Sequence, residues 1–396
     1  HAPASLPLPP GFEGAPPVLA LGAELKATFC LARGQEAILS QHMGDLEEAT
    51  TFEDWRRGIA LYEALYGHAA GVIAVDRHPD YLSAKYGRAR AAAAGLFAVE
   101  VQHHHAHVAA CLAENGRPLS APPVLGIVAD GLGLGDDGTL WGGEFLLADY
   151  RGFRRLGHLK PVAMPGGAMA AREPWRNLHA QLMAALGWKE FAAGFGDLPL
   201  AHALAEKPRA TLDAMIRDGR FAPRASSIGR LFDAVAAALD ICRERQSYEG
   251  QAAMMLEAIV DRRTLATEEA YPFAVSAPVD GPACLDPSPL WRALLGDLAR
   301  GVPAAVISAR FHLGLARALV GMARRLRGEG AALFDTVALS GGCFQNEILF
   351  NETARGLSAA GFRVLSHKLV PANDGGIALG QALIALATTS GAGPCA

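Results

Sequence analysis

The stretch from Gln102 to His107 holds the residues of this chain best suited to chemistry. Four of the five residues from 103 to 107 are histidines, and His103 and His107 stand four positions apart. On a helix, positions i and i+4 share one face about one turn apart, so both imidazoles could bind one divalent metal ion. A solvated polar patch, or a helix start with hydrogen-bonded histidines, would explain the same run, so a third ligand is needed to decide.

Two aspartates stand where a third ligand is expected. Asp130 and Asp374 each follow an apolar run and lie beside glycines. A carboxylate oxygen at either place would complete a site of two histidines and one carboxylate for iron or zinc. Each aspartate could instead cap a turn or a helix N-terminus. The helix expected after Asp374 favours the cap there, whereas Asp130 is evenly balanced between the two interpretations.

Three glycine-containing turns follow apolar runs and together favour nucleotide binding. They comprise residues 22–26, 130–138 and 340–342. Glycines after strands let backbone N–H groups approach phosphate oxygens closely. None of the three matches a P-loop or an intact dinucleotide-binding motif, so each alone is explained by an ordinary tight turn. Lys26, in the first turn, could pair with a phosphate or lie on the surface of a hairpin.

The composition limits the class of protein. With 396 residues, 51% of them hydrophobic and 19% charged, the chain can bury a large core in one two-lobed domain or two ordinary ones. A net charge of −4 without a long basic run argues against nucleic acid as a partner. Six cysteines without a CxxC pair predict no zinc finger or disulfide framework and favour a cytoplasmic location. No apolar run of membrane length is expected, and so no membrane partner.

Strand-like and helix-like patterns alternate along the chain, which predicts an α/β fold. Strands are expected at 18–22, 28–31, 71–76, 96–101, 124–129, 140–149, 336–339 and 364–366. Helices are expected at 52–65, 83–94, 103–112, 168–186, 201–218, 229–237, 251–266, 309–326 and 377–387. Each half opens with two strands around a glycine turn, so we expect two lobes that clasp a nucleotide at their strand ends.

The same patterns predict where the chain divides. We expect a disordered leader or linker over 1–17, lobe I over 18–121, lobe II over 122–376 and a loose tail over 389–396. The closing helix, 377–388, is expected to return to lobe I.

Six longer motifs, taken together and in order, resemble one family. They are Val101–His107, Asp130–Gly135, Leu140–Phe145, Arg172–Arg176, Ser340–Asn346 and Asn373–Gly376. They resemble the C-terminal carbamoyltransferase domain of HypF, a hydrogenase maturation family related to TsaD-type threonylcarbamoyl transferases and TobZ-type O-carbamoyltransferases. The resemblance spans about residues 18–388. It implies a two-lobed actin/sugar-kinase/Hsp70-like (ASKHA) fold with nucleotide and metal in the cleft between the lobes.

The resemblance also implies roles for individual residues. The implied ligands of one divalent metal, iron or zinc, are His103, His107, Asp130 and Asp374. The implied nucleotide contacts are Gly131, Asp233, Gly250, Gly341, Gly342 and Asn346, with Asp233 on the ribose. Lys26 and Asp130 are the implied catalytic residues, Lys26 as a phosphate contact. His104 and His105 would be supporting or surface residues, or a base for the acceptor.

The implied activity is an ATP-dependent carbamoyl transfer. Carbamoyl phosphate and ATP, with Mg²⁺, would give carbamoyl adenylate, and the carbamoyl group would pass to the C-terminal cysteine thiol of HypE for cyanide ligand synthesis. Full-length HypF proteins also have zinc modules, an acylphosphatase-like domain and a YrdC-like domain, where the adenylate is expected to form. The sequence leaves open whether this chain makes the adenylate itself, and also its oligomeric state. A small-molecule O-carbamoyltransferase and a non-catalytic nucleotide-binding partner protein are the alternatives.

Overall fold

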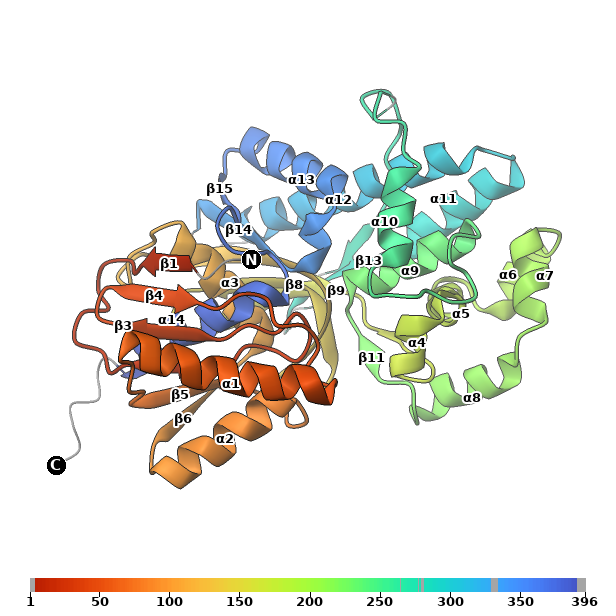
Figure 1. The fold of residues 1–396 in the computed structure, drawn as a ribbon. Helices are drawn as coiled ribbons and strands as arrows, with labels where there is room; N and C mark the ends of the chain where they lie inside the picture. The colour runs from red at the N-terminus through yellow and green to blue at the C-terminus, as the bar shows by residue number, and fades with distance from the viewer. Residues whose placement is uncertain (1–3, 264, 277, 279–280, 329–333, 390–396) are drawn as a thin grey trace.

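The computed structural model describes residues 4–263, 265–276, 278, 281–328 and 334–389. Within them the strands form two sheets, and the sheets divide the chain between residues 101 and 124. Figure 1 shows the first sheet with its helices at one end of the molecule and a group of helices from the middle of the chain at the other end. The mixed α/β character expected from the alternating pattern is confirmed.

The first sheet has six strands in the order β1-β4-β3-β2-β5-β6. Its strands are β1 (Ala4–Pro7), β2 (Val18–Ala20), β3 (Cys30–Arg33), β4 (Glu36–Leu39), β5 (Val72–Asp76) and β6 (Phe97–Val101). Side chains alternate between its two faces. Leu19 and Ile73 pack with the helices α1 (Ala49–Tyr66) and α2 (Leu82–Ala94), whereas Val18 and Val72 point to the opposite face and a separate apolar cluster.

Residues 4–17 are ordered, so the expectation of a disordered leader over 1–17 is wrong for this part; residues 1–3 lie outside the described residues. β1 pairs antiparallel with β4, with Ala4 opposite Leu39. Phe12 is buried, and its ring meets that of Tyr150 edge-on at 5.1 Å. The many prolines of this segment hid the strand, because proline is tolerated in an edge strand such as β1.

The second sheet has nine strands, seven of them in the order β12-β13-β9-β8-β7-β14-β15. The strands are β7 (Val124–Leu134), β8 (Leu140–Ala148), β9 (Phe153–Leu159), β10 (Val162–Ala163), β11 (Arg224–Ala225), β12 (Ala274–Ser276), β13 (Ala283–Asp286), β14 (Thr336–Ser340) and β15 (Arg363–Leu365). The glycine turn expected over 130–138 is wrong in part, since β7 continues to Leu134. The register of β7 against β8 shifts between Ala129 and Gly133, and such bulges re-aim side chains, here that of Asp130.

The remaining helices cover or join the two sheets. They are α3 (His103–Glu114), α4 (Ala168–Arg172), α5 (Pro174–Ala185), α6 (Trp188–Phe195), α7 (Pro199–Ala205), α8 (Arg209–Asp218), α9 (Ile228–Ala238), α10 (Gln251–Ala258), α11 (Ser288–Ala299), α12 (Ala304–Gly328), α13 (Glu347–Ala359) and α14 (Ile377–Thr389). Short 3₁₀ turns cover Gly342–Gln345 and Asp374–Gly376. The helices expected over 168–186 and 201–218 are each broken in two near Pro174 and Pro208, because proline interrupts the helical hydrogen bonds.

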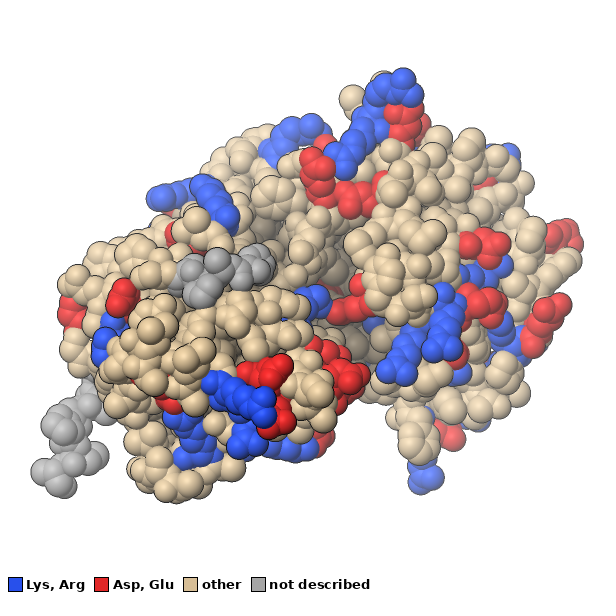
Figure 2. All heavy atoms as spheres, viewed as in Figure 1, with Lys and Arg blue, Asp and Glu red and all other residues tan. Residues whose placement is uncertain are grey.

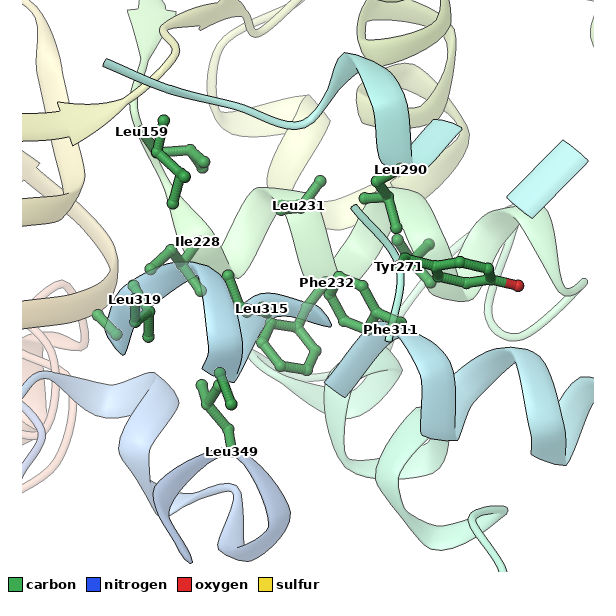
Figure 3. Packing of buried hydrophobic residues seen from close by; sticks show 14 of the residues in the cluster. Leu159, Ile228, Leu231, Phe232, Tyr271, Leu290, Phe311, Leu315, Leu319 and Leu349 are labelled. Atoms are coloured by element: carbon green, nitrogen blue, oxygen red, sulfur yellow. The ribbon is translucent and has the colours of Figure 1, made fainter. Parts of the chain in front are cut away.

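Helix α12 runs through the largest apolar core. The ring centroid of its Phe311 lies 4.9 Å from that of Phe232 on α9. Leu315 and Leu319 of α12 belong to the same buried cluster (Figure 3). By length and composition alone α12 could cross a membrane, which corrects the expectation that no apolar run reaches that length. However, 61% of its most apolar window is buried inside the protein, as expected of a core helix.

Helices α3 and α14 form two layers between the sheets. α3 packs on β7, β8 and β14, while α14 packs on β2, β3 and β5, and the two helices pack on each other. At their crossing Gly380 touches α3 so closely that an added Cβ would lie 1.9 Å from the carbonyl oxygen of Ala106. The histidine helix, expected in lobe I by chain order, therefore rests on the second sheet, and its N-terminal end lies where the two halves meet.

Candidate active site

The four predicted metal ligands come together from three parts of the chain. His103 and His107 lie on the first turns of α3, Asp130 at the irregularity of β7, and Asp374 on the 3₁₀ turn before α14. One ligand atom from each of the four lies within 4.8 Å of the others. The i and i+4 spacing of the histidines on a helix thus places both imidazoles against the two carboxylates, as the sequence predicted.

The facing atoms of this cluster lie slightly too far apart for hydrogen bonds. His107 Nε2 lies 3.4 Å from Asp130 Oδ2 and 3.7 Å from Asp374 Oδ1, and His103 Nε2 lies 3.5 Å and 3.8 Å from the same two atoms. Both Nε2 atoms and Asp130 Oδ2 are buried without a hydrogen-bond partner among the described residues. Each such orphaned atom costs about 1–3 kcal/mol, so this donor set fits a divalent cation of the iron or zinc type.

The other ring nitrogen of His103 is held by Asp76. His103 Nδ1 lies 2.8 Å from Asp76 Oδ2 at the end of β5, and both side chains are about 1% exposed. The second oxygen of Asp76 accepts a 2.8 Å hydrogen bond from the backbone N–H of His78, whose ring stacks on Tyr81. A carboxylate in this position fixes the tautomer and the ring orientation of a metal-binding histidine.

His107 is supported from the other side by a row of buried polar groups. Ser340 Oγ, at the end of β14, lies 3.4 Å from His107 Nδ1 and donates a 3.0 Å hydrogen bond to the His107 carbonyl oxygen. The same hydroxyl lies 2.8 Å from His367 Nε2. His367 Nδ1 in turn lies 2.6 Å from Glu114 Oε1 at the end of α3, so the row starts and ends on one helix.

The charges of the cluster stabilise one another. Burial works against protonation of His103 and His107, but the attraction of neighbouring carboxylates, Asp130 above all, and for His103 also the contact with Asp76, outweigh it and raise both pKa values. Burial likewise opposes the ionised form of Asp130, and the two histidines outweigh it, so its pKa lies well below the usual range. Asp130 is therefore an anion that also accepts a 3.0 Å hydrogen bond from the Gly342 N–H.

The two middle histidines, His104 and His105, are not members of the metal-ligand cluster. His104 Nδ1 lies 3.1 Å from the side-chain amide of Gln102, and His105 Nε2 lies 2.6 Å from the carbonyl oxygen of Asp149. Both are buried, so neither is the surface residue that the sequence allowed. Burial is the main cause that lowers both pKa values. His105 is already committed to a carbonyl oxygen and does not face the cluster, so it is unsuited to act as its base.

A cavity of about 230 Å³ begins at the two metal-site aspartates. Figure 2 shows this face of the molecule hollowed between the two halves. The predicted residues that line the cavity are Lys26, Asp130, Gly131, Asp233, Gly250, Gly342, Asn346 and Asp374. Gly341 is not among the residues that line the cavity. Its φ is 100°, and an added Cβ would lie 2.3 Å from the Ala129 carbonyl oxygen. Its role is therefore to shape the turn.

The two predicted polar nucleotide contacts, Asp233 and Asn346, differ in whether their side chains already have hydrogen-bond partners. Both carboxylate oxygens of Asp233 are buried without a hydrogen bond among the described residues, although Arg230 Nε lies 2.9 Å from Oδ2. Burial, only partly offset by Arg230, raises the pKa of Asp233 to about 6. The Asn346 side chain is occupied: it accepts from the Leu349 N–H at 2.8 Å and lies 2.9 Å from His312 Nε2.

Lys26 closes the cavity from the first half of the molecule. It forms an ion pair with Glu249, which precedes Gly250 at the start of α10. Burial disfavours the ammonium, but Asp374 and Glu249 outweigh it and raise its pKa. Its backbone has φ of 51°, unusual for a residue with a side chain, so the hairpin turn aims this cation into the cavity.

Sequence reasoning missed several residues that build the site. They are Asp76, Glu114, Arg230, Glu249 and His367, whereas Ser340 was part of the predicted turn over 340–342 but had no assigned role. Asp76 had a usable signal, because it ends a buried strand where ligand-binding residues gather in α/β folds. Glu114 and His367 are 253 positions apart in the chain, and no local pattern connects them.

The fold and the site define a class of protein: a two-lobed α/β protein with a cavity and a metal-ligand cluster where its halves meet. Family models refine this class. Residues 126–381 match the carbamoyltransferase Kae1-like domain, second subdomain, and residues 13–114 match the HypF Kae1-like domain. The chain therefore belongs to the HypF carbamoyltransferase family, as the sequence motifs indicated.

Individual relatives agree with this assignment. The chain is 45% identical to carbamoyltransferase HypF of Rhodobacter capsulatus, over 98% of this chain and 49% of that protein. It is 41% identical to the carbamoyltransferase HypF homolog of Cupriavidus necator, over 96% of this chain and 93% of that protein. A crystal structure of full-length HypF in the phosphate- and nucleotide-bound form superposes with a TM-score of 0.86 at 34% identity, over 98% of this chain and 48% of that one. The chain thus spans about half the length of the first of these relatives and of the solved HypF.

Proposed function

We propose that this chain is an ATP-dependent carbamoyltransferase of hydrogenase maturation, and that it passes a carbamoyl group from carbamoyl adenylate to the C-terminal cysteine of HypE in the cytoplasm. One observation supports the proposal most strongly: Asp130 and Asp374 belong both to the metal-ligand cluster and to the wall of the cavity. A nucleotide in that cavity would hold its activated group beside the cluster. The names of the relatives, and the nucleotide and phosphate bound to the solved HypF, support a nucleotide-dependent carbamoyl transfer.

The cavity residues have complementary roles toward an adenylate. Asp233, whose two oxygens have no hydrogen-bond partner among the described residues although Arg230 lies beside one of them, would accept hydrogen bonds from the ribose hydroxyls. The backbone at Gly131, Gly250 and Gly342 leaves room for close approach of the nucleotide. Lys26 would exchange its partner Glu249 for the phosphate and stabilise the charge that develops on AMP as it leaves.

The cluster would be filled by one divalent iron or zinc ion. His103, His107, Asp130 and Asp374 would hold it, with Asp76 and Ser340 fixing the two imidazoles. A metal at this place would act as a Lewis acid on the carbamoyl group and as a template for it.

The transfer itself exchanges one bond for another. The acceptor sulfur forms a C–S bond to the carbamoyl carbon, the C–O bond to AMP breaks, and AMP takes the electron pair while the thiol proton leaves to a base. Residues from both halves of the molecule hold donor and acceptor in one geometry, which supplies proximity.

Mass measurement of the acceptor tests the proposal. The chain is mixed with HypE, carbamoyl phosphate and ATP, with and without a separate YrdC-like domain to supply carbamoyl adenylate. A carbamoyl-sized increase on the HypE C-terminal cysteine is expected in at least one arm, and a variant with His103→Ala and His107→Ala should lose it. An unchanged mass in both arms, with nucleotide still bound, would instead support a non-catalytic nucleotide-binding protein.

A further inference from the structure

A second cavity, of about 490 Å³, adjoins the nucleotide cavity. It is lined by Lys26, Thr28, Leu39, Ser40, His42, Gln345, Lys368, Leu369, Val370, Pro371, Asn373 and Gly375. Three of these residues, Lys26, Gln345 and Asn373, also line the nucleotide cavity. The two cavities therefore share a wall, and the second one has no assigned ligand.

The shared wall is also the approach to the metal-ligand cluster. Asn373 Nδ2 donates a 3.0 Å hydrogen bond to Gln345 Oε1, and Asn373 Oδ1 accepts one from the Gly375 N–H. Asp374 stands between these two lining residues in the chain, and its carboxylate belongs to the cluster. Thr28 anchors the same turn through a 3.0 Å hydrogen bond to the Gly375 carbonyl oxygen. A group bound in the second cavity thus lies beside Asp374.

The lining of the second cavity favours an anion. It has two cationic side chains, Lys26 and Lys368, and no carboxylate, while His42 adds no charge because burial lowers its pKa. Among the described residues, the Lys368 ammonium has no hydrogen-bond or ion-pair partner, and its side chain is exposed. The backbone of Lys368 is nevertheless fixed, because its N–H donates a 2.9 Å hydrogen bond to Glu114. A free cation on a fixed loop is a suitable partner for a carboxylate.

We propose that this second cavity binds the C-terminal carboxylate of the acceptor protein, with Lys368 as its ion-pair partner and His42 as a further polar contact. The inference rests on the proposed function, which places the acceptor thiol on a C-terminal cysteine. In such a residue the thiol and the carboxylate share one Cα, so anchoring the carboxylate here keeps the sulfur close to the cavity wall, which includes both chain neighbours of Asp374. An internal cysteine has no carboxylate to offer, which would give the enzyme its preference for a chain end.

Peptide binding tests this inference without any transfer. A peptide with the last residues of HypE, ending in cysteine, is compared as free acid and as C-terminal amide, with nucleotide present and no carbamoyl donor. We expect the free acid to bind about fivefold more tightly, the size of a partly exposed charge pair. Lys368→Ala should remove this discrimination and Lys368→Arg should keep it. Lys189→Ala, an exposed lysine on α6, is the matched control and should behave as the unchanged protein.

The outcomes separate this inference from the proposed function. Equal affinity for acid and amide, or discrimination that survives in Lys368→Ala, overturns the carboxylate site even where carbamoyl transfer is seen. Discrimination lost only in Lys368→Ala supports the site even where the mass assay shows no transfer, in which case the proposed function alone fails. Unchanged adenosine affinity in Lys368→Ala would show that the variant is correctly folded.

Discussion

Asp76 holds His103 by a 2.8 Å contact between Oδ2 and Nδ1, deep in the protein and on the side of the ring that faces away from the metal-ligand cluster. The contact turns His103 Nε2 toward Asp130 and Asp374. Because Asp76 ends β5 of the first sheet and Asp130 belongs to β7 of the second, the cluster depends on both halves of the molecule.

Replacing Asp76 should therefore weaken metal binding without touching a ligand. We expect Asp76→Asn to lower affinity for Zn²⁺ or Fe²⁺ about 10- to 100-fold, because the amide no longer fixes the tautomer of His103 or raises its basicity. Competition with a chelator measures this. Asp80→Asn, an exposed carboxylate in the following loop, is the control, and equal losses in both variants would contradict the assigned role of Asp76.

The support of His107 gives a parallel prediction. Glu114 fixes His367 at 2.6 Å and accepts N–H groups of residues 368–370. Glu114→Gln keeps an acceptor for the loop but removes the charge beside His367, so we expect a smaller loss of metal affinity, about tenfold. The d–d spectrum of bound Co²⁺ should shift as well, since the geometry at His107 changes. A loss of thermal stability with an unchanged spectrum would show that Glu114 is only structural.

The crossing of α3 and α14 predicts a strong effect of one methyl group. Gly380→Ala would place Cβ 1.9 Å from the Ala106 carbonyl oxygen, so the helices must move apart at a cost of about 1–3 kcal/mol in the free energy of unfolding. Denaturant unfolding measures this. Gly321→Ala on α12 meets no atom within 4 Å and should be neutral or stabilising by up to about 1 kcal/mol. Equal stability of the two variants would refute the tight crossing.

Much of the fold could be predicted because apolar periodicity reports local burial. The pattern around Val72–Asp76 and the i, i+4 spacing of His103 and His107 both led to the observed elements. The ordered edge strand at Ala4–Pro7 could not be predicted in this way, since its stability comes from pairing with β4. The position of α3 on the second sheet also depends on tertiary packing, here on the contact of Gly380 with Ala106.

The candidate site, too, contains residues that the sequence predicted and residues that only the tertiary structure reveals. Motif resemblance supplied the facing ligands and part of the cavity lining, including Asp233. It did not supply Glu114 or His367, because their contact joins distant segments of the chain. Neither segment has a local sequence motif that indicates the contact. Nor did it show that the side chain of Asn346 is occupied by its cap on α13, which only the hydrogen bonds reveal.

The raised pKa values of His103 and His107 predict how metal affinity depends on pH. A histidine ligand must be deprotonated to bind metal. Both folded-state pKa values lie above the ordinary one, so below them a metal ion must displace protons. Affinity should fall as pH falls, by about tenfold per pH unit for each proton displaced. Calorimetry in buffers of different ionisation enthalpy counts the released protons, and no release near neutral pH would contradict the prediction.

The raised pKa of Asp233 predicts that nucleotide binding also depends on pH. Its pKa is raised to about 6, so its carboxylate ionises as pH rises through that value. Only the ionised form accepts from both ribose hydroxyls, so adenosine affinity should rise with pH through about 6 and level off above it. Adenosine is the proper probe because it has no phosphate that titrates in this range. Asp233→Asn should bind adenosine more weakly and without this pH dependence, while binding metal normally. If the unchanged protein shows the same adenosine affinity on both sides of pH 6, Asp233 does not contact the ribose, and the nucleotide lies differently in the cavity.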